Sequence, residues 1–101
     1  MSNRFDPDLL DNEDPFEIDT QAAHLFKHPH LGIDDIVAVW ASDPLFYPAK
    51  PPAHWLMAAA VDGRVLTVPL APSRSGDVRY CRPIGCYQAS VDLTNQYWRD
   101  R

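Results

Sequence analysis

Long apolar runs, positive charge and signal-like segments are scarce in this sequence. No run approaches the roughly 18 apolar residues of a membrane-spanning helix, so we expect no membrane segment. Residues 1–15 are acidic and lack the apolar core of a secretion signal, which favours a cytoplasmic location. The net charge of −5 argues against indiscriminate nucleic-acid binding, which needs a basic face. A small basic patch on an acidic body is still compatible with that charge.

Cysteine is limited to Cys81 and Cys86. Two cysteines do not make the multi-bridge framework of a small secreted domain. We expect both to be buried, reduced thiols, because the cytoplasm keeps thiols reduced. A disulfide between them is the alternative.

The chain has 101 residues, enough for one small domain with a modest core. Its ten prolines predict many interrupted segments. Residues 1–15 are rich in aspartate and have few apolar anchors. We therefore expect a flexible acidic arm at 1–15 and a single α+β domain at 16–101.

Two helices are expected before the strands. Asp19 or Thr20 can cap a first helix that ends near Pro29, because proline disfavours helix in the residue before it. Gly32 and two aspartates open a second helix, which ends near Ser42. Apolar residues at spacings of three and four give this second helix a broad apolar face. That face consists of Ile33, Ile36, Val37, Val39 and Trp40.

Three to four antiparallel strands follow the helices. The Asp62–Gly63 dipeptide between two apolar runs predicts a hairpin. Ser90 can cap a C-terminal helix. The expected strands are 45–47, 54–62, 64–71 and 77–87. This order predicts an α+β fold with the helices packed on one face of the meander.

Several short segments, in this order, carry a family resemblance. They are "FEID" at 16–19, Lys27–His28, Asp43–Pro44, "IGCYQAS" at 84–90, and Tyr97. Together with the order of the elements they resemble the BrnT toxins, small ribonucleases of type II toxin–antitoxin pairs. The resemblance implies a RelE-like fold, with two N-terminal helices and a C-terminal helix on the sheet. The chain departs from the family at Gln21, His24 and Tyr87, where the family has Lys, Asn and Arg.

The resemblance implies a metal-independent endoribonuclease that is neutralised by a cognate antitoxin. Such cleavage removes a proton from the 2′-hydroxyl, stabilises the phosphorane charge and protonates the leaving 5′-oxygen. The candidate catalytic residues are Lys27, His28, Arg82 and Tyr87. The candidate RNA-binding residues are Arg79, Trp55 and Tyr97. RNA and the antitoxin are the expected partners, self-association stays open, and no cofactor or metal is expected.

The residue types fit these roles. His28 can act as acid or base, since imidazole titrates near neutral pH. Lys27 or Arg82 can hold a phosphate, the arginine through a bidentate fork. Tyr87 or Trp55 can stack on a base.

Structural interpretations compete with these roles. His28 suits the C-terminal end of a helix dipole, and Lys27 suits a solvated helix surface. Arg79 and Arg82 are an odd number of residues apart, so on a regular strand only one of them faces the site. Arg82 is preferred because it neighbours the closing segment. Tyr97 is also suited to packing between helix and sheet.

Two further alternatives concern the site as a whole. His24 and His28 share a helix face, but a pair of histidines without a third ligand is a weak metal signal. The departures at Gln21 and Tyr87, with the acidic balance, favour a second function class. That class is a catalytically inactive RelE-like protein that serves as a protein-interaction module.

Overall fold

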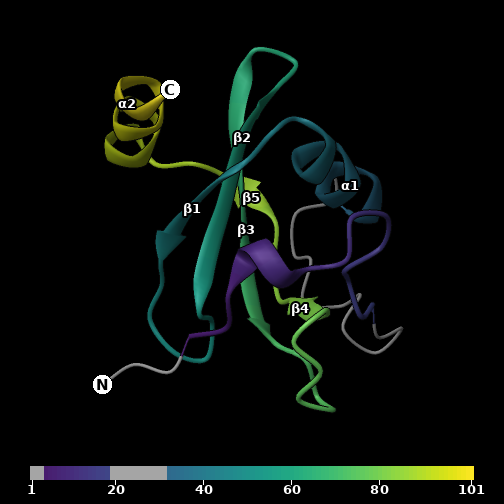
Figure 1. Ribbon diagram of the computed structural model, residues 1–101. Coiled ribbons are helices and arrows are strands. Elements are labelled where there is room, and N and C mark those ends of the chain that lie inside the picture. Colours follow the sequence, from purple (N-terminus) through teal and green to yellow (C-terminus); the bar gives the residue numbers. More distant parts are fainter. Residues whose placement is uncertain (1–3, 19–31) are drawn as a thin grey trace.

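The computed structural model describes residues 4–18 and 32–101. Among these residues, five strands form one antiparallel sheet in the order β1-β2-β3-β4, with β5 also paired to β3 (Figure 1). The elements are η1 (Pro7–Leu9), α1 (Ile33–Ala41), β1 (Leu45–Pro48), β2 (Trp55–Val61), β3 (Arg64–Pro72), β4 (Cys81–Pro83), β5 (Tyr87–Gln88) and α2 (Val91–Asp100). The expected α+β class and antiparallel sheet are confirmed. The first expected helix, at 19–29, lies outside the described residues, so the finer RelE-like arrangement stays a prediction.

The centre of the sheet is the β2–β3 hairpin. The register pairs Val61 with Arg64, which leaves Asp62 and Gly63 as the turn. Both turn residues have positive φ, 52° and 83°, as a type I′ turn requires. The Asp-Gly hairpin predicted from the sequence is therefore confirmed.

The strand expected at 77–87 is instead two short strands separated by a bulge. Ile84 donates its backbone N–H to the Pro69 carbonyl, and Tyr87 lies opposite Thr67. Residues 85 and 86 therefore share the single position opposite residue 68, as in a β-bulge. Pro83 contributes to the break because it has no N–H to donate.

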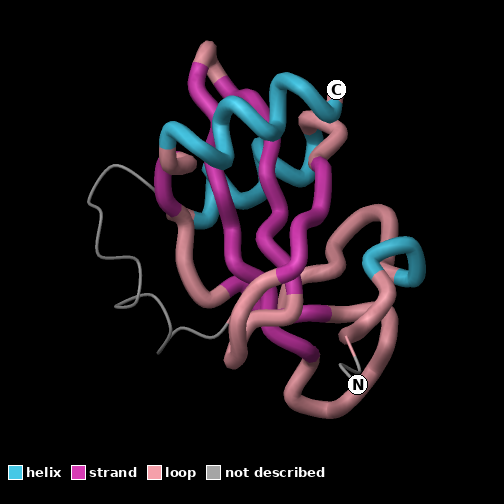
Figure 2. The backbone as a smooth tube through the Cα atoms, turned by 90° about the vertical axis from the view of Figure 1, so that its left-hand side faces the viewer, coloured by secondary structure: helices cyan, strands magenta, loops and turns pink. Residues whose placement is uncertain are grey.

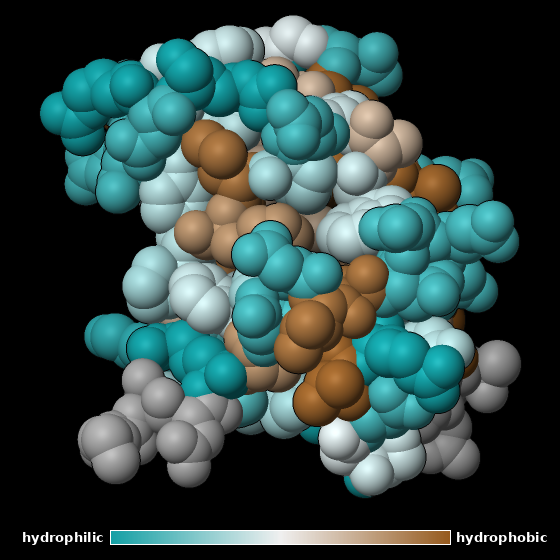
Figure 3. Space-filling model, viewed as in Figure 1, coloured by the Kyte–Doolittle hydropathy of each residue, from teal (hydrophilic) through white to brown (hydrophobic). Residues whose placement is uncertain are grey.

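Helix α1 packs through a narrower face than its sequence pattern indicated. Ile36 and Val39 are fully buried, whereas Ile33 and Val37 are about half exposed. Trp40, expected to be buried against the sheet, is half-buried and meets Phe16 edge to face. Figure 3 shows that apolar residues reach the surface in a central patch on the face seen in Figure 1. Helix α1 therefore packs on the core through the side that carries Ile36 and Val39.

Helix α2 lies on the opposite face of the sheet from α1 (Figure 1 and Figure 2). Its start is as predicted, because the Ser90 hydroxyl accepts a hydrogen bond from the Leu93 N–H. Tyr97, only 1% exposed, packs with Ala58 and Val65. The expectation that all helices share one face is wrong, because β2 and β3 are apolar on both faces and each face needs a cover.

The N-terminal segment, residues 4–18, packs against the domain. Leu10 is 5% exposed and belongs to the main core, although Leu9 beside it is 52% exposed. The Trp55 indole N–H donates to the Phe5 carbonyl at 2.7 Å. Phe5 and Leu10 therefore anchor this segment to the domain, and the flexibility expected for residues 1–15 stays a prediction.

In the described part of the chain, no helix combines the length and apolar character needed to cross a membrane. Cys81 and Cys86 are both buried and unpaired, as expected.

Candidate functional site

A pocket of about 260 Å³ lies between the N-terminal segment and the β3–β4 loop. It is lined by Glu17, Ile18, Arg74, Ser75 and Arg82, and we name it the Glu17–Arg82 pocket. Two arginines and one glutamate therefore line one small hollow. Among residues 4–18 and 32–101, Arg82 is the only member of the sequence-predicted catalytic set that lines it.

Backbone pairing brings Glu17 to this pocket. The Glu17 N–H donates to the Cys81 carbonyl, and the Cys81 N–H donates to the Pro15 carbonyl, both at 2.8 Å. These bonds add the N-terminal segment to the outer side of β4 as an isolated parallel bridge at Phe16. The side chain of Glu17 is consequently fixed beside the loop that follows β3.

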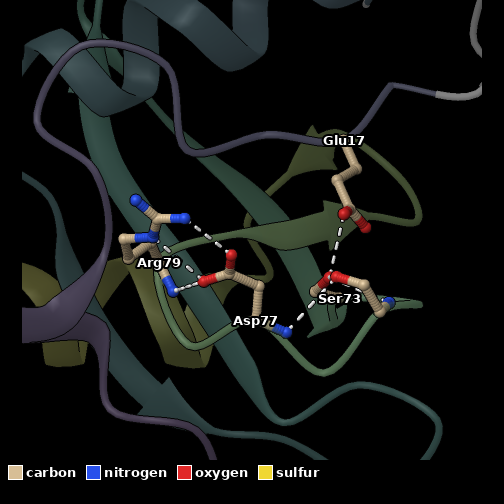
Figure 4. Close-up of polar contacts among 5 residues, drawn as sticks. Glu17, Ser73, Asp77 and Arg79 are labelled. Carbon is tan, nitrogen blue, oxygen red and sulfur yellow. Dashed lines mark hydrogen bonds and ion pairs between the residues drawn. The ribbon is translucent and has the colours of Figure 1, made fainter.

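The Glu17 carboxylate then holds that loop through two hydrogen bonds. The Ser73 hydroxyl donates to Oε2 at 2.8 Å, and the Arg74 backbone N–H donates to Oε1 at 3.1 Å. Figure 4 shows the Glu17 side chain reaching from the N-terminal segment to Ser73. The carboxylate is thus oriented by the loop that it stabilises.

Two serine hydroxyls organise the rest of the loop. Ser73 and Ser75 share a hydrogen bond of 2.8 Å between their Oγ atoms. The Asp77 backbone N–H donates to the Ser75 Oγ at 3.3 Å. Short hydroxyl side chains that bond to nearby backbone groups are typical of turns. The loop is therefore held by its own polar side chains.

Arg82 reaches the pocket from β4. Its Nε donates to the Pro72 carbonyl at 2.9 Å, which fixes the plane of the guanidinium. A guanidinium has five N–H donors, so this bond engages only one of them. The geometry suits an arginine that is oriented for contact with an anion.

Arg79, an expected RNA contact, is engaged by its own loop. Its Nε and Nη2 donate to the two carboxylate oxygens of Asp77 at 3.1 and 2.9 Å (Figure 4). Hydrogen bonding from Arg79 lowers the pKa of Asp77 to about 2. The Arg79 guanidinium also lies over the Tyr80 ring. The Arg79 guanidinium therefore stabilises the β3–β4 loop.

Tyr87 lies on the same face of the sheet as Arg82, because the bulge shifts the register by one residue. Their partners on β3 are Thr67 and Ala71, four residues apart, which is about 13 Å along a strand. Tyr87 is half-buried, and burial raises the pKa of its hydroxyl. The backbone positions of Arg82 and Tyr87 are thus well separated along the sheet.

The other two expected RNA contacts have structural partners. The Tyr97 hydroxyl accepts a hydrogen bond from the Ala60 N–H at 3.1 Å, inside the core under α2. Trp55 is bonded to the N-terminal segment, and the Arg4 guanidinium lies over its ring at 5.8 Å. These residues sit on different elements from Arg79 and do not form one surface with it.

Lys27, His28 and His24 lie outside the described residues, so their proposed roles stay predictions. Across residues 4–18 and 32–101, no group of three His, Cys, Asp or Glu side chains is placed to hold a metal ion. Sequence reasoning missed Glu17, Arg74, Ser73 and Ser75. The segment "PSRSG" was interpreted only as a turn, and Glu17 only as part of a lead-in.

No protein-family model matches the chain, and no curated protein or solved structure matches it either.

Proposed function

We propose that the chain is a BrnT-like toxin that cuts RNA without a metal and is held inactive by a cognate antitoxin. One observation carries the proposal: Arg74 and Arg82 line one pocket in a chain whose net charge is −5. On an acidic body, a phosphodiester backbone is attracted where positive charge is concentrated. Bidentate bonding to phosphate is the characteristic chemistry of arginine.

In this proposal Arg82 holds the phosphate and stabilises the charge that develops on it. His28 acts as general acid or base, and Lys27 assists in binding the phosphate. In sequence, Lys27 follows Ile18, a lining residue of the pocket, by nine positions. Glu17 adds a carboxylate that can accept the 2′-hydroxyl proton. Tyr87 contacts a neighbouring base instead of the same phosphate, because of its separation from Arg82 along the sheet.

The test is RNA cleavage by the purified chain in the presence of a chelator, with induced growth arrest as the second measurement. Arg82→Ala should lower the cleavage rate by about 10²-fold or more, as expected for loss of charge stabilisation in the transition state. Arg99→Ala is the matched control, since Arg99 is an exposed arginine on α2. Equal activity of the two variants would remove Arg82 from the site. Wild-type protein that is folded but neither cuts RNA nor arrests growth would reject the enzyme proposal.

A second candidate function is a catalytically inactive protein-interaction module. The observation that favours it is the engagement of Arg79, Tyr97 and Trp55 in contacts within the protein. These residues would otherwise be available to RNA. The module predicts tight binding to a protein partner with no RNA cleavage, so the same two assays separate the two functions.

A further inference from the structure

A second cavity, of about 420 Å³, lies where the N-terminal segment meets the end of α1 and the start of β1. Its apolar wall includes Leu10 together with the aromatic side chains Trp40 and Phe46. Its charged residues are Asp8 and Asp43, and no lysine, arginine or histidine is among the described residues that line it. We name it the Trp40 cavity.

The aromatic wall is rigidly held. The Trp40 indole N–H donates to the Asn12 carbonyl at 3.3 Å, so its polar edge is bonded within the protein. Trp40 also meets Phe16 edge to face, with ring centroids 5.6 Å apart. Phe46 packs against the main core below. The cavity thus keeps its shape without a ligand, as binding pockets of this size commonly do.

The two carboxylates are available at the rim. Asp8 is exposed, and the side chain of Asp43 is 94% exposed. Asp43 follows Ser42, the C-cap of α1, and has a φ of 56°, a left-handed conformation that aspartate tolerates better than most residues. The negative charge therefore borders the aromatic wall without being buried in it.

A guanidinium group of the chain itself already lies at this rim. Arg101 donates from Nη1 to the Asp43 carbonyl at 2.8 Å, and its Nη2 is 3.5 Å from the Asp43 carboxylate. Arg101 is not part of the cavity lining, and the second distance is too long for a strong ion pair. The contact shows that the electrostatics of the rim favour a cation, while most of the Asp43 carboxylate stays accessible.

The neighbouring strand limits how a partner can bind here. β1 is an edge strand, and it begins at this cavity. The residue before it, Pro44, lines the cavity and has no N–H, so it cannot extend a hydrogen-bonded ladder there. A partner is therefore expected to bind at this corner through a side chain that enters the cavity. Pairing of an added strand with β1 is disfavoured there.

We propose that the Trp40 cavity receives an arginine side chain from a partner protein. A guanidinium can stack on the indole while its N–H groups bond to the Asp8 and Asp43 carboxylates. Its apolar stem covers the Leu10 wall. The occupant is complementary in charge to the cavity, and the site is separate from the Glu17–Arg82 pocket. The inference does not depend on RNA cleavage.

The test is a titration of the full chain with the peptide acetyl-Gly-Arg-Gly-amide, followed by NMR of the indole N–H signals. The Trp40 signal is assigned with the Trp40→Phe variant. We expect a saturable shift of this signal, larger than those of Trp55 and Trp98. Acetyl-Gly-Gln-Gly-amide should cause no comparable shift. Equal shifts with the two peptides would overturn the proposal, because the cationic group would then be irrelevant.

Charge variants supply the matched control. Asp8→Asn with Asp43→Asn should weaken peptide binding roughly tenfold, as expected for two modest ion pairs. Asparagine tolerates the left-handed conformation at position 43, so this variant should fold. Asp62→Asn with Asp92→Asn removes the same net charge far from the cavity and should bind as the wild type does. Equal losses in the two double variants would overturn the proposal.

A second copy of the chain is the competing occupant, because its own surface carries exposed arginines. Sedimentation velocity of the free chain distinguishes this case. A monomer that binds the peptide supports a partner protein. A dimer that dissociates in the Asp8→Asn, Asp43→Asn variant would assign the cavity to self-association and overturn the proposal.

Discussion

Arg79 and Arg82, three positions apart, show how neighbouring residues of one type acquire different roles. Arg79 precedes β4 and pairs with Asp77 two residues earlier. Arg82 lies on β4 and bonds to the carbonyl of Pro72 across the loop. The difference arises because a short-range aspartate is available to one guanidinium and only a backbone carbonyl to the other. Charge type alone therefore does not identify the arginine that meets a ligand.

At the residue scale, the two buried thiols predict how the stability of the protein depends on pH. Burial raises the pKa of Cys81 from the usual 9.0 to about 12, and that of Cys86 to about 11. Above pH 9 the unfolded chain loses these protons while the folded chain keeps them. The free energy of unfolding should therefore fall as pH rises, by up to about 1.4 kcal/mol per pH unit for each thiol.

Urea titrations between pH 7.5 and 10.5 measure this dependence. The Cys81→Ala, Cys86→Ala double variant should show a shallower fall than the wild type over the same range. The comparison uses the slopes, because the two substitutions also leave cavities that lower stability at every pH. Parallel slopes would mean that the thiols ionise as easily in the folded protein as in the unfolded chain.

At the scale of the element, the β2–β3 hairpin and the β4–β5 segment respond differently to local sequence. The hairpin turn is determined by two residues that adopt positive φ, and it appears where the dipeptide predicts it. The β4–β5 segment is interrupted by Pro83 and by the bulge opposite Val68, which depends on its partner β3. A turn is a local structure, whereas a bulge is defined only by pairing between two strands.

The hairpin turn provides the prediction at this scale. Gly63 has a φ of +83°, and a Cβ added there would meet no atom within 4 Å. Gly63→Ala should therefore lower the free energy of unfolding by about 1–2 kcal/mol through backbone strain alone. Gly85→Ala is the control, since Gly85 does not have a positive φ and an added Cβ would meet Pro69 only at ordinary van der Waals distance. Similar losses in both variants, measured by chemical denaturation, would show that the turn does not impose the strain.

For the whole molecule, the central question is whether the N-terminal segment belongs to the domain. It contributes Leu10 to the core, Phe16 to the edge of β4 and Glu17 to the pocket. The Trp40 cavity is therefore built across the boundary at residue 15 that composition indicated, because residues on both sides of that boundary line it. If residues 1–15 were a free arm, the Trp40 cavity would not exist as described.

Two adjacent leucines test this integration. Leu10→Ala should cost about 2–5 kcal/mol, as for other buried leucines, because the side chain fills part of the core. Leu9→Ala should change stability by less than about 0.5 kcal/mol, since its side chain is half exposed. Chemical denaturation of both variants measures the difference. Two equally small effects would indicate a flexible arm, as composition predicted.

Local chemistry in the sequence was sufficient to predict several elements. The Asp62–Gly63 turn, the Ser90 cap and the second helix each depend on residues within a few positions of one another. For the same reason, Arg82 could be chosen by its nearness to the closing segment. These features require no knowledge of distant parts of the chain.

Only the tertiary structure decided which distant groups meet. The bond between Glu17 and Ser73 spans 56 residues, and the bond between Trp40 and Asn12 spans 28. The sequence also did not predict that α1 and α2 lie on opposite faces of the sheet. A strand that is apolar on both sides does not indicate which helix covers which side. Sequence patterns report periodicity within one element, whereas pockets form between elements. For this reason the sequence determined the elements, and packing determined the two cavities in which their side chains can act.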